Sequence, residues 1–438
     1  MPTGLMVPLL SEKDDAEKSE GGIDPLGLEV IADALGTRLV PGVRERQTHP
    51  RYLTAIAVGL AVCERFDEGT FAADGVSEPW QVFEWHLVEG LVRTAGAGRS
   101  RGVPGSLKVS KAIEDKVPLS ARRYLKTPST FGFHGIYRLL ARTLGVEQGE
   151  RLGEFGYELL EVWSKERGLN GFIGSADGPG RAVKQQLFRA IEEGLGSGAV
   201  ARAPGWVGWD YFRRYLDPLV PGDAEAALIL RELPDDSKGF RTPTIEFLTS
   251  TTGQGVWKES AGSERAWHTA LRASANAELQ RLLDAISLYE RFCRLCQDAF
   301  DDCLCEMTRT SGRISPTQLG KLESLQKASR EVPTLFFELL DRLDPFGQAG
   351  RLRDTCQSLA TICSPTEWAV LLTDHHRDTQ HRKPPDGKQP WFERFDDGSL
   401  ILRPLYKRET PGRHDDRYVH AYRTSPLWSF VTDLRAVS

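Results

Sequence analysis

The spacing of apolar residues along this chain predicts mainly α-helices. Asp24 followed by Pro25 is a typical helix start, and apolar side chains then recur every three to four residues. Residues 51–66 are apolar on most sides, which predicts a buried helix, and residues 79–94 show the same period. Further helices are predicted over residues 118–126, 134–145, 148–167, 178–195, 316–330, 334–343 and 366–380.

Two segments depart from this simple alternation of helix and turn. Residues 264–307 carry helical spacing with almost no glycine or proline, which predicts one long helix or two abutting helices. Near the end the period changes to that of strands: residues 391–395 and 399–406 flank an Asp-Gly turn, and residues 416–423 follow as a third strand. The predicted class is mainly α, with a small C-terminal antiparallel β-meander.

The length of 438 residues favours two or three subdomains. Residues 11–24 are polar and acidic and lack apolar periodicity, so residues 1–24 are predicted to form a flexible acidic lead-in. Breaks in the helical pattern then divide the chain into a helical domain over 25–200, a second helical domain over 201–365 that contains the long helix 264–307, and a C-terminal helix plus β-meander over 366–438.

Charge is distributed unevenly along the chain. The net charge is −5, yet residues 93–142 contain eleven Lys or Arg and two acidic residues, a local net charge of +9 that leaves −14 for the rest. A block of one sign in an otherwise acidic protein is typical of a surface that contacts a polyanion. The sequence therefore predicts a nucleic-acid-binding segment at residues 93–142.

Local patterns place these cations on specific elements. Two arginines lie in a glycine-rich loop, others are expected on short helices, and residues 127–135 combine hydroxyls, glycines and a helix N-terminus, which would suit a bound anion. An alternative is that Arg93, Arg138 and Arg142 form ion pairs with acidic helices such as residues 148–162. The candidate nucleic-acid-binding residues of this segment are Arg99, Arg101, Lys108, Lys111, Arg122, Arg123, Lys126, Arg138 and Arg142.

Residues 375–391 form a second candidate contact, because three histidines, four Lys or Arg and a Trp crowd into a loop with Pro and Gly. Cations and an aromatic ring on one loop suit phosphate or an unstacked base. The alternative is a helix end and solvated turn, since cations at a helix C-terminus complement its dipole. The candidate residues here are His376, Arg382, Lys383, Lys388 and Trp391.

Catalytic and metal motifs are weak. No phosphate-binding loop, nucleophile elbow or zinc-protease motif occurs, so no catalytic residue, metal ligand or cofactor is predicted. Cys293, Cys296, Cys303 and Cys305 sit on one helical pattern, which favours small core residues over a metal site. A nuclease or phosphohydrolase would have to use His375, His376, Asp378, His381 and His414.

Residues 24–62 and 121–146 together carry a Pro-Gly and basic stretch before an Arg-Tyr-Leu helix, then Tyr-Leu-Lys-Thr-Pro, a Gly-rich turn and Tyr-Arg. In these features the first third of the chain resembles large uncharacterised bacterial proteins of anti-phage defence gene clusters. The resemblance implies a component of a multiprotein complex that acts near nucleic acid. It supplies no catalytic residues.

Seven cysteines without a secretory pattern, and the absence of any stretch of about 18 apolar residues, favour a cytoplasmic location and no membrane partner. The leading hypothesis is a non-catalytic protein that binds DNA or RNA within such a complex. The alternatives are an interaction scaffold that docks an acidic protein, and an unrecognised metal-dependent nuclease or phosphohydrolase.

Overall fold

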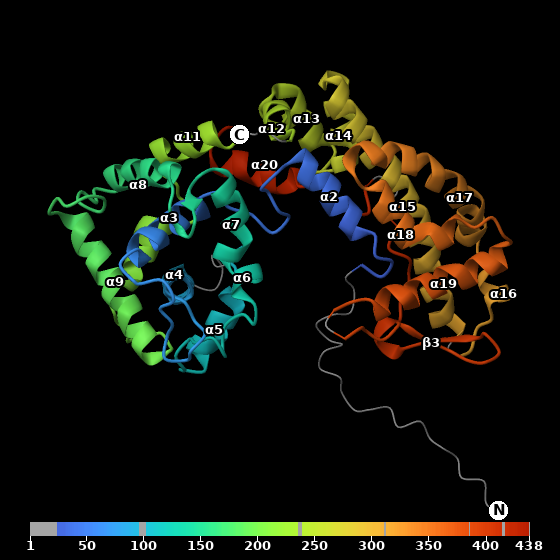
Figure 1. The fold of residues 1–438 in the computed structure, drawn as a ribbon, viewed down its shortest axis with the longest axis horizontal. Helices are drawn as coiled ribbons and strands as arrows, with labels where there is room; N and C mark the ends of the chain where they lie inside the picture. Colours follow the sequence, from blue (N-terminus) through green and yellow to red (C-terminus); the bar gives the residue numbers. More distant parts are fainter. Residues whose placement is uncertain are drawn as a thin grey trace, which may run out of the picture. The chain divides into compact units, whose positions relative to one another are not determined.

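The computed structural model describes residues 24–95, 102–234, 239–310, 312–384, 386–413 and 417–437. The described chain is mainly helical, as the sequence predicts (Figure 1). Its β-structure consists of two small antiparallel hairpins, of which only the C-terminal one was expected. It forms two compact units, each built from separated stretches of sequence. Unit 1 comprises residues 1–35 and 276–420, and unit 2 comprises residues 36–275 and 421–438.

Unit 2 contains the buried helix α3 (Tyr52–Cys63), which packs against α4 (Pro79–Ala95), α7 (Phe133–Thr143), α8 (Glu154–Glu166), α9 (Pro179–Ser197) and the hairpin of β1 (Glu147–Gln148) and β2 (Arg151–Leu152). Its small residues allow close packing: a methyl group at Gly59 would lie 2.8 Å from the ring of Phe83. Unit 2 also contains α5 (Ser106–Glu114), α6 (Pro128–Phe131), α10 (Trp209–Leu216) and α11 (Asp223–Glu232). The unit is completed by α12 (Arg241–Thr249), α13 (Thr251–Glu259), α14 (Glu264–Ser274) and α20 (Thr424–Asp433).

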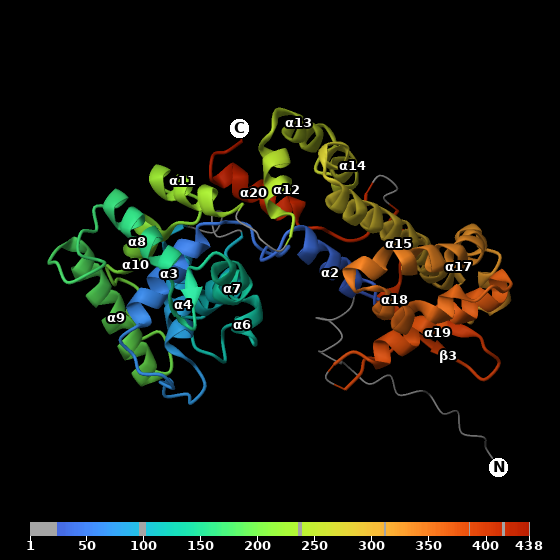
Figure 2. The ribbon, with the colours of Figure 1, turned by 45° about the horizontal axis from the view of Figure 1, so that its top comes forward.

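Unit 1 is built on the long helix α15 (Ala277–Thr310), which packs along α17 (Glu323–Leu343) (Figure 2). Helix α2 (Glu29–Leu39) begins in unit 1 and ends in unit 2. The remaining elements of unit 1 are α16 (Pro316–Leu319), η1 (Asp344–Phe346), α18 (Ala349–Cys356), η2 (Gln357–Ala360), α19 (Pro365–His381), β3 (Phe392–Arg394), β4 (Leu400–Leu402) and η3 (Pro404–Tyr406).

The predicted segment 264–307 consists of two helices, α14 and α15. The break falls at Ala275 and Asn276, where the Asn276 side chain accepts a hydrogen bond of 2.9 Å from the amide of Leu279 and so starts α15. The division between the units falls at the same place. Neither predicted internal boundary, at residue 200 or 365, coincides with this division, because breaks in the helical pattern mark loops within a unit as well as between units.

Three predicted elements are wrong. Residues 118–126 form turns instead of a helix, and α17 runs as one helix through Pro333, where two helices were expected. The described residues 417–423 form no strand. Carboxylates replace strand pairing there: Glu290 accepts from the amides of residues 419 and 420, and Glu264 accepts from those of residues 422 and 424.

The C-terminal hairpin itself forms as predicted, with Phe392 paired to Leu402 across a turn that contains Gly398 at φ 77°. The free edge of β4 pairs with Ile314 through an isolated bridge, so a distant loop takes the place of the expected third strand. The acidic lead-in predicted over residues 1–24 lies outside the described residues except for Asp24. The Asp24 carboxylate accepts from the amides of Leu28 and Glu29, which supports the start of α2.

Candidate nucleic-acid interface and neighbouring pocket

The described cations of the segment 93–142 fall into two groups, and the first is neutralised within unit 2. Arg93 pairs with Glu89 at 2.6 Å. Arg138 and Arg142 both pair with the buried carboxylate of Glu147, at 2.8 and 2.9 Å. These two arginines therefore pair within the chain, as the alternative interpretation holds, although their shared partner lies in strand β1 and not on the following helix.

The second group is exposed, and none of its members forms an ion pair with another described residue. It lies on the outer face of α5, whose inner face buries Val109 and Ala112, and on the turns that follow α5. Tyr124 joins the two parts, because its side chain is buried against the backbone at Gly105. We call this group the basic surface; its residues are Lys108, Lys111, Lys116, Arg122, Arg123 and Lys126.

Two apolar side chains lie close in sequence to the basic surface. Leu107 on α5 is 87% exposed, and Phe131 at the end of α6 is 43% exposed. The guanidinium of Arg46 lies 4.7 Å from the centre of the Phe131 ring. Exposed apolar side chains beside cations are typical of surfaces that contact a partner, since both kinds of contact strengthen binding. Arg99 and Arg101 lie outside the described residues.

The predicted anion seat at the N-terminus of α7 is filled by a carboxylate of the chain itself. Glu84 is fully buried on α4, accepts from the amide of His134 at 3.2 Å and accepts from the hydroxyl of Tyr124 at 2.7 Å. Burial raises the pKa of Glu84 to about 7, although these hydrogen bonds favour the charged form. The helix N-terminus therefore binds a carboxyl group, but this group belongs to the chain itself and not to a partner.

Gly132 permits this approach, and its replacement should be costly. A methyl group at residue 132 would lie 1.9 Å from Oε1 of Glu84. We expect Gly132→Ala to lower the free energy of unfolding by about 1–3 kcal/mol, because the buried carboxylate has no space to move into. Denaturant unfolding would measure the loss, with Gly205→Ala as a control, since no atom lies within 4 Å of a methyl group there. Equal stability of the two variants would contradict this account of Gly132.

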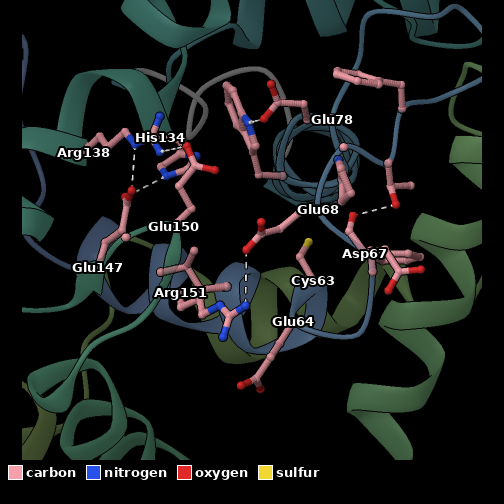
Figure 3. A pocket seen from close by; sticks show the side chains of 18 residues that line it. Cys63, Glu64, Asp67, Glu68, Glu78, His134, Arg138, Glu147, Glu150 and Arg151 are labelled. Carbon is pink, nitrogen blue, oxygen red and sulfur yellow. Dashed lines mark hydrogen bonds and ion pairs between the residues drawn. The ribbon is translucent and has the colours of Figure 1, made fainter.

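A pocket of about 450 Å³ is lined in part by His134 and Arg138 of α7 (Figure 3). Its walls come from the end of α3 and the loop after it, the start of α4, α7 and the β1–β2 hairpin. Carboxylates dominate the lining, and Figure 3 shows Glu68 and Arg151 meeting from opposite walls, 3.2 Å apart. The charged residues of the lining are Glu64, Asp67, Glu68, Glu78, Arg138, Glu147, Glu150 and Arg151. An acidic lining of this kind disfavours phosphate.

One wall of the pocket is an organised charge cluster around Glu147. Burial opposes ionisation of Glu147, but hydrogen bonds and ion pairs with His134 and Arg138 prevail and lower its pKa to about 2. Burial lowers the pKa of His134, and the edge of that ring meets Trp80 with 4.6 Å between ring centres. The sequence analysis did not identify Glu84 or Glu147 as site residues. The one available signal was that each is an acidic residue close in sequence to the basic segment 93–142.

The candidate binding residues of the loop 375–391 also divide into side chains with partners inside the chain and exposed side chains. His376 and Trp391 are buried, and the two nitrogens of His376 contact the carbonyl of Pro25 and the amide of Trp391, at 2.8 and 3.1 Å. Lys383 is half-buried and donates to the carbonyl of Asp24 at 2.9 Å. Arg382 is exposed and Lys388 is half-buried. The loop is thus anchored on residues 24–26, which leaves Arg382 as its most accessible cation.

Two of the histidines required by the hydrolase alternative, His375 and His376, have structural roles, whereas His381 is exposed. His375 contacts the carbonyl of Leu26 at 2.7 Å, and burial lowers the pKa of both His375 and His376, the latter to about 3. Among the described residues, neither histidine belongs to a cluster of three potential metal ligands. His414 lies outside the described residues.

The cysteines on α15 are buried free thiols, as predicted for core residues. This includes Cys305, which the helical pattern placed away from the other three. Burial raises the pKa of each of these thiols, which favours the neutral form.

Comparison with protein-family models, curated proteins and solved structures found no match to this chain. In the part of the chain that the structure describes, no helix combines the length and apolar character needed to cross a membrane. The function must therefore be argued from the residues and geometry described above.

Proposed function

We propose that this protein binds nucleic acid through the basic surface, as a non-catalytic component of a multiprotein complex. The observation that carries the proposal is the set of six exposed cations on α5 and residues 116–126, none of which has an ion-pair partner among the described residues. Exposed cations that form no ion pair within the chain remain available to phosphates. The resemblance of the first third of the chain further supports a role in anti-phage defence.

The internal pairing of Arg138 and Arg142 narrows the proposed contact. Both residues neutralise Glu147, so the polyanion would meet residues 108–126, with Arg382 as a separate candidate in unit 1. The basic surface contains no long helix or β-ribbon that could lie in a groove of duplex DNA, since α5 has nine residues and the residues after it form turns. We therefore propose contacts to the phosphate backbone, with little sequence preference.

The salt dependence of binding tests this proposal. Six phosphate contacts should make the affinity fall by about 10³ between 50 and 200 mM salt, because each contact releases condensed counterions. Fluorescence anisotropy with labelled duplex DNA, single-stranded DNA and RNA would measure the affinity and identify the preferred polymer. Absence of binding to all three at about 50 mM salt would overturn the proposal.

Charge reversal on the basic surface should then locate the contact. We expect Arg122→Glu with Arg123→Glu to abolish binding that is measurable for the unchanged protein, since two attractions become repulsions. Arg351→Glu with Arg353→Glu is the matched control, because both arginines are exposed on α18 and the net charge changes equally. Equal loss in both variants would mean that only net charge matters and that the basic surface is not the contact.

An acidic protein is the alternative partner for the same surface, and the exposed Leu107 favours it. Under this alternative the anisotropy experiment shows no nucleic-acid binding. Affinity capture with the unchanged protein would then recover a protein that the Arg122→Glu/Arg123→Glu variant does not recover.

A further inference from the structure

A carboxylate, a thiol and an imidazole that could together bind a metal ion lie close to one another on and beside α15 in unit 1. Glu290 and Cys293 are three residues apart on this helix, so both side chains lie on one face. His420 comes from the segment where the chain leaves unit 1. A carboxylate oxygen, the Cys293 sulfur and a ring nitrogen of His420 all lie within 4.8 Å of one another.

Several contacts hold the three ligands in place. The carboxylate of Glu290 meets Nδ1 of His420 at 2.8 Å and accepts from the amides of Val419 and His420. Arg294 donates to the carbonyl of Arg417 at 2.9 Å, which fastens the same segment to α15. The ring of Tyr289 stacks on that of His420 with 6.3 Å between centres. The donor atoms are thus positioned by hydrogen bonds and packing that do not involve an ion.

The site is almost closed to solvent. Cys293 is fully buried, and the side chains of Glu290 and His420 are 3% and 13% exposed. Burial raises the pKa of the Cys293 thiol, and the neighbouring Glu290 carboxylate and the thiols of Cys296 and Cys356 raise it further. A divalent cation would reverse this electrostatic situation, since it neutralises the carboxylate and stabilises the thiolate.

We propose that Glu290, Cys293 and His420 bind one Zn²⁺ ion. A nitrogen, a sulfur and an oxygen donor together suit zinc, whereas magnesium and calcium prefer oxygen ligands alone. Zinc ligands lie about 2.0–2.3 Å from the ion, which places tetrahedral donors about 3–4 Å apart. The three donor atoms here lie within 4.8 Å of one another, so a small adjustment of the side chains would let them share one ion. Water would complete the coordination. The proposal does not depend on nucleic-acid binding.

Bound zinc would join α15 to residues 417–420, the last segment of unit 1 before the chain enters unit 2. Such an ion would stabilise the fold of unit 1, because the ligands come from parts of the chain more than 120 residues apart and are brought together only by folding. The role that follows is structural.

Metal analysis of the purified, tag-free protein tests the proposal. We expect about one zinc ion per chain by mass spectrometry of the metal content. Protein loaded with Co²⁺ should show a thiolate-to-cobalt charge-transfer band together with the visible bands of a tetrahedral site. Zinc removal by a chelator should lower the melting temperature of the unchanged protein.

Matched variants assign the ligands. Cys293→Ser should reduce the bound metal at least tenfold and remove the charge-transfer band, whereas Cys303→Ser, at another buried thiol on α15, should retain both. His420→Asn provides a second ligand variant at a partly exposed position, in case Cys293→Ser does not fold. Absence of bound metal, or equal metal content in His420→Asn and the unchanged protein, would overturn the proposal and leave an ion pair beside a core thiol.

Discussion

Replacement of Glu225 with alanine should lower the free energy of unfolding of unit 2 by about 3–5 kcal/mol, because the guanidinium of Arg51 would be left buried without its carboxylate. Glu225 is fully buried on α11, and Nε of Arg51 lies 3.0 Å from its nearer carboxylate oxygen. The hydroxyl of Thr54 donates to the same carboxylate at 2.6 Å, and the amide of Gly222 donates at 3.1 Å. Loss of Glu225 therefore removes the acceptor for several buried donors at once.

Arg51 cannot move to solvent to escape this cost, because its other nitrogens donate to the carbonyls of Tyr215 and Asp217. Denaturant unfolding followed by hydrogen exchange in α3 would report the stability of unit 2 separately from that of unit 1. Glu158→Ala is the control: Glu158 pairs with Arg231 on the exposed surface, and its loss should leave stability unchanged within error. A loss in Glu225→Ala no larger than in the control would show that burial of the Arg51 pair is unimportant.

Glu84 and Glu264 should each make unit 2 less stable as the pH rises from about 4.5 to about 7, whereas His86, His134 and His268, whose pKa values are lowered by burial, act in the opposite direction over part of this range. Burial raises the pKa of both Glu84 and Glu264 from the ordinary 4.5 to about 7. The folded state therefore binds these protons more tightly than the unfolded state, so their contribution is complete below pH 4.5 and is lost as the pH rises through 7. A shift of this size corresponds to about 3 kcal/mol for each group.

Glu84→Gln isolates the first of these groups, because a neutral amide fits the same space. The carbonyl of the new side chain can accept from the amide of His134, and Tyr124 can turn its hydroxyl toward the carbonyl of Pro104. We expect the variant to match the unchanged protein near pH 4.5 and to exceed its stability by up to about 3 kcal/mol above pH 7.

Unfolding curves at several pH values would measure this difference, and Glu264→Gln added to Glu84→Gln should raise the stability above pH 7 further, by removing the contribution of the second carboxyl group. Glu147 does not affect this comparison. Its pKa is lowered from the ordinary 4.5 to about 2, so its contribution to the stability of unit 2 is lost only as the pH falls below about 4.5. An identical pH dependence in Glu84→Gln and the unchanged protein would show that Glu84 does not retain its proton near neutral pH.

Much of the helical fold follows from local sequence. The spacing of apolar residues predicts the helices α3, α4, α9 and α19, and the Asp-Gly turn predicts the C-terminal hairpin. Predictions failed where a distant side chain supplied what a local pattern could not show. Residues 417–423 have the alternating pattern of a strand. However, the amides of Val419 and Tyr422 donate to the carboxylates of Glu290 and Glu264, so these amides do not pair with a neighbouring strand. Helix α20 was missed because only ten residues carry its pattern.

Local sequence was also insufficient to define the basic surface. Charge counting located the basic segment, yet it could not distinguish Arg122, which is exposed, from Arg138, which pairs with Glu147. The aromatic and cationic loop at residues 375–391 resembles a ligand-binding tip in sequence, whereas His376 and Trp391 are core residues. Composition reports how many charges a segment carries, and only packing decides which of them have a partner.

By itself, the sequence determined the mainly α class, the positions of most helices and the concentration of positive charge before residue 142, because each of these depends on neighbours within a few turns of the chain. The tertiary structure alone decided that residues 421–437 rejoin residues 36–275 in unit 2, that Glu84 occupies the N-terminus of α7, and that His420 meets Glu290 and Cys293. These contacts join residues tens to hundreds of positions apart. Their partners are selected by the burial of whole helix faces, which no local pattern records.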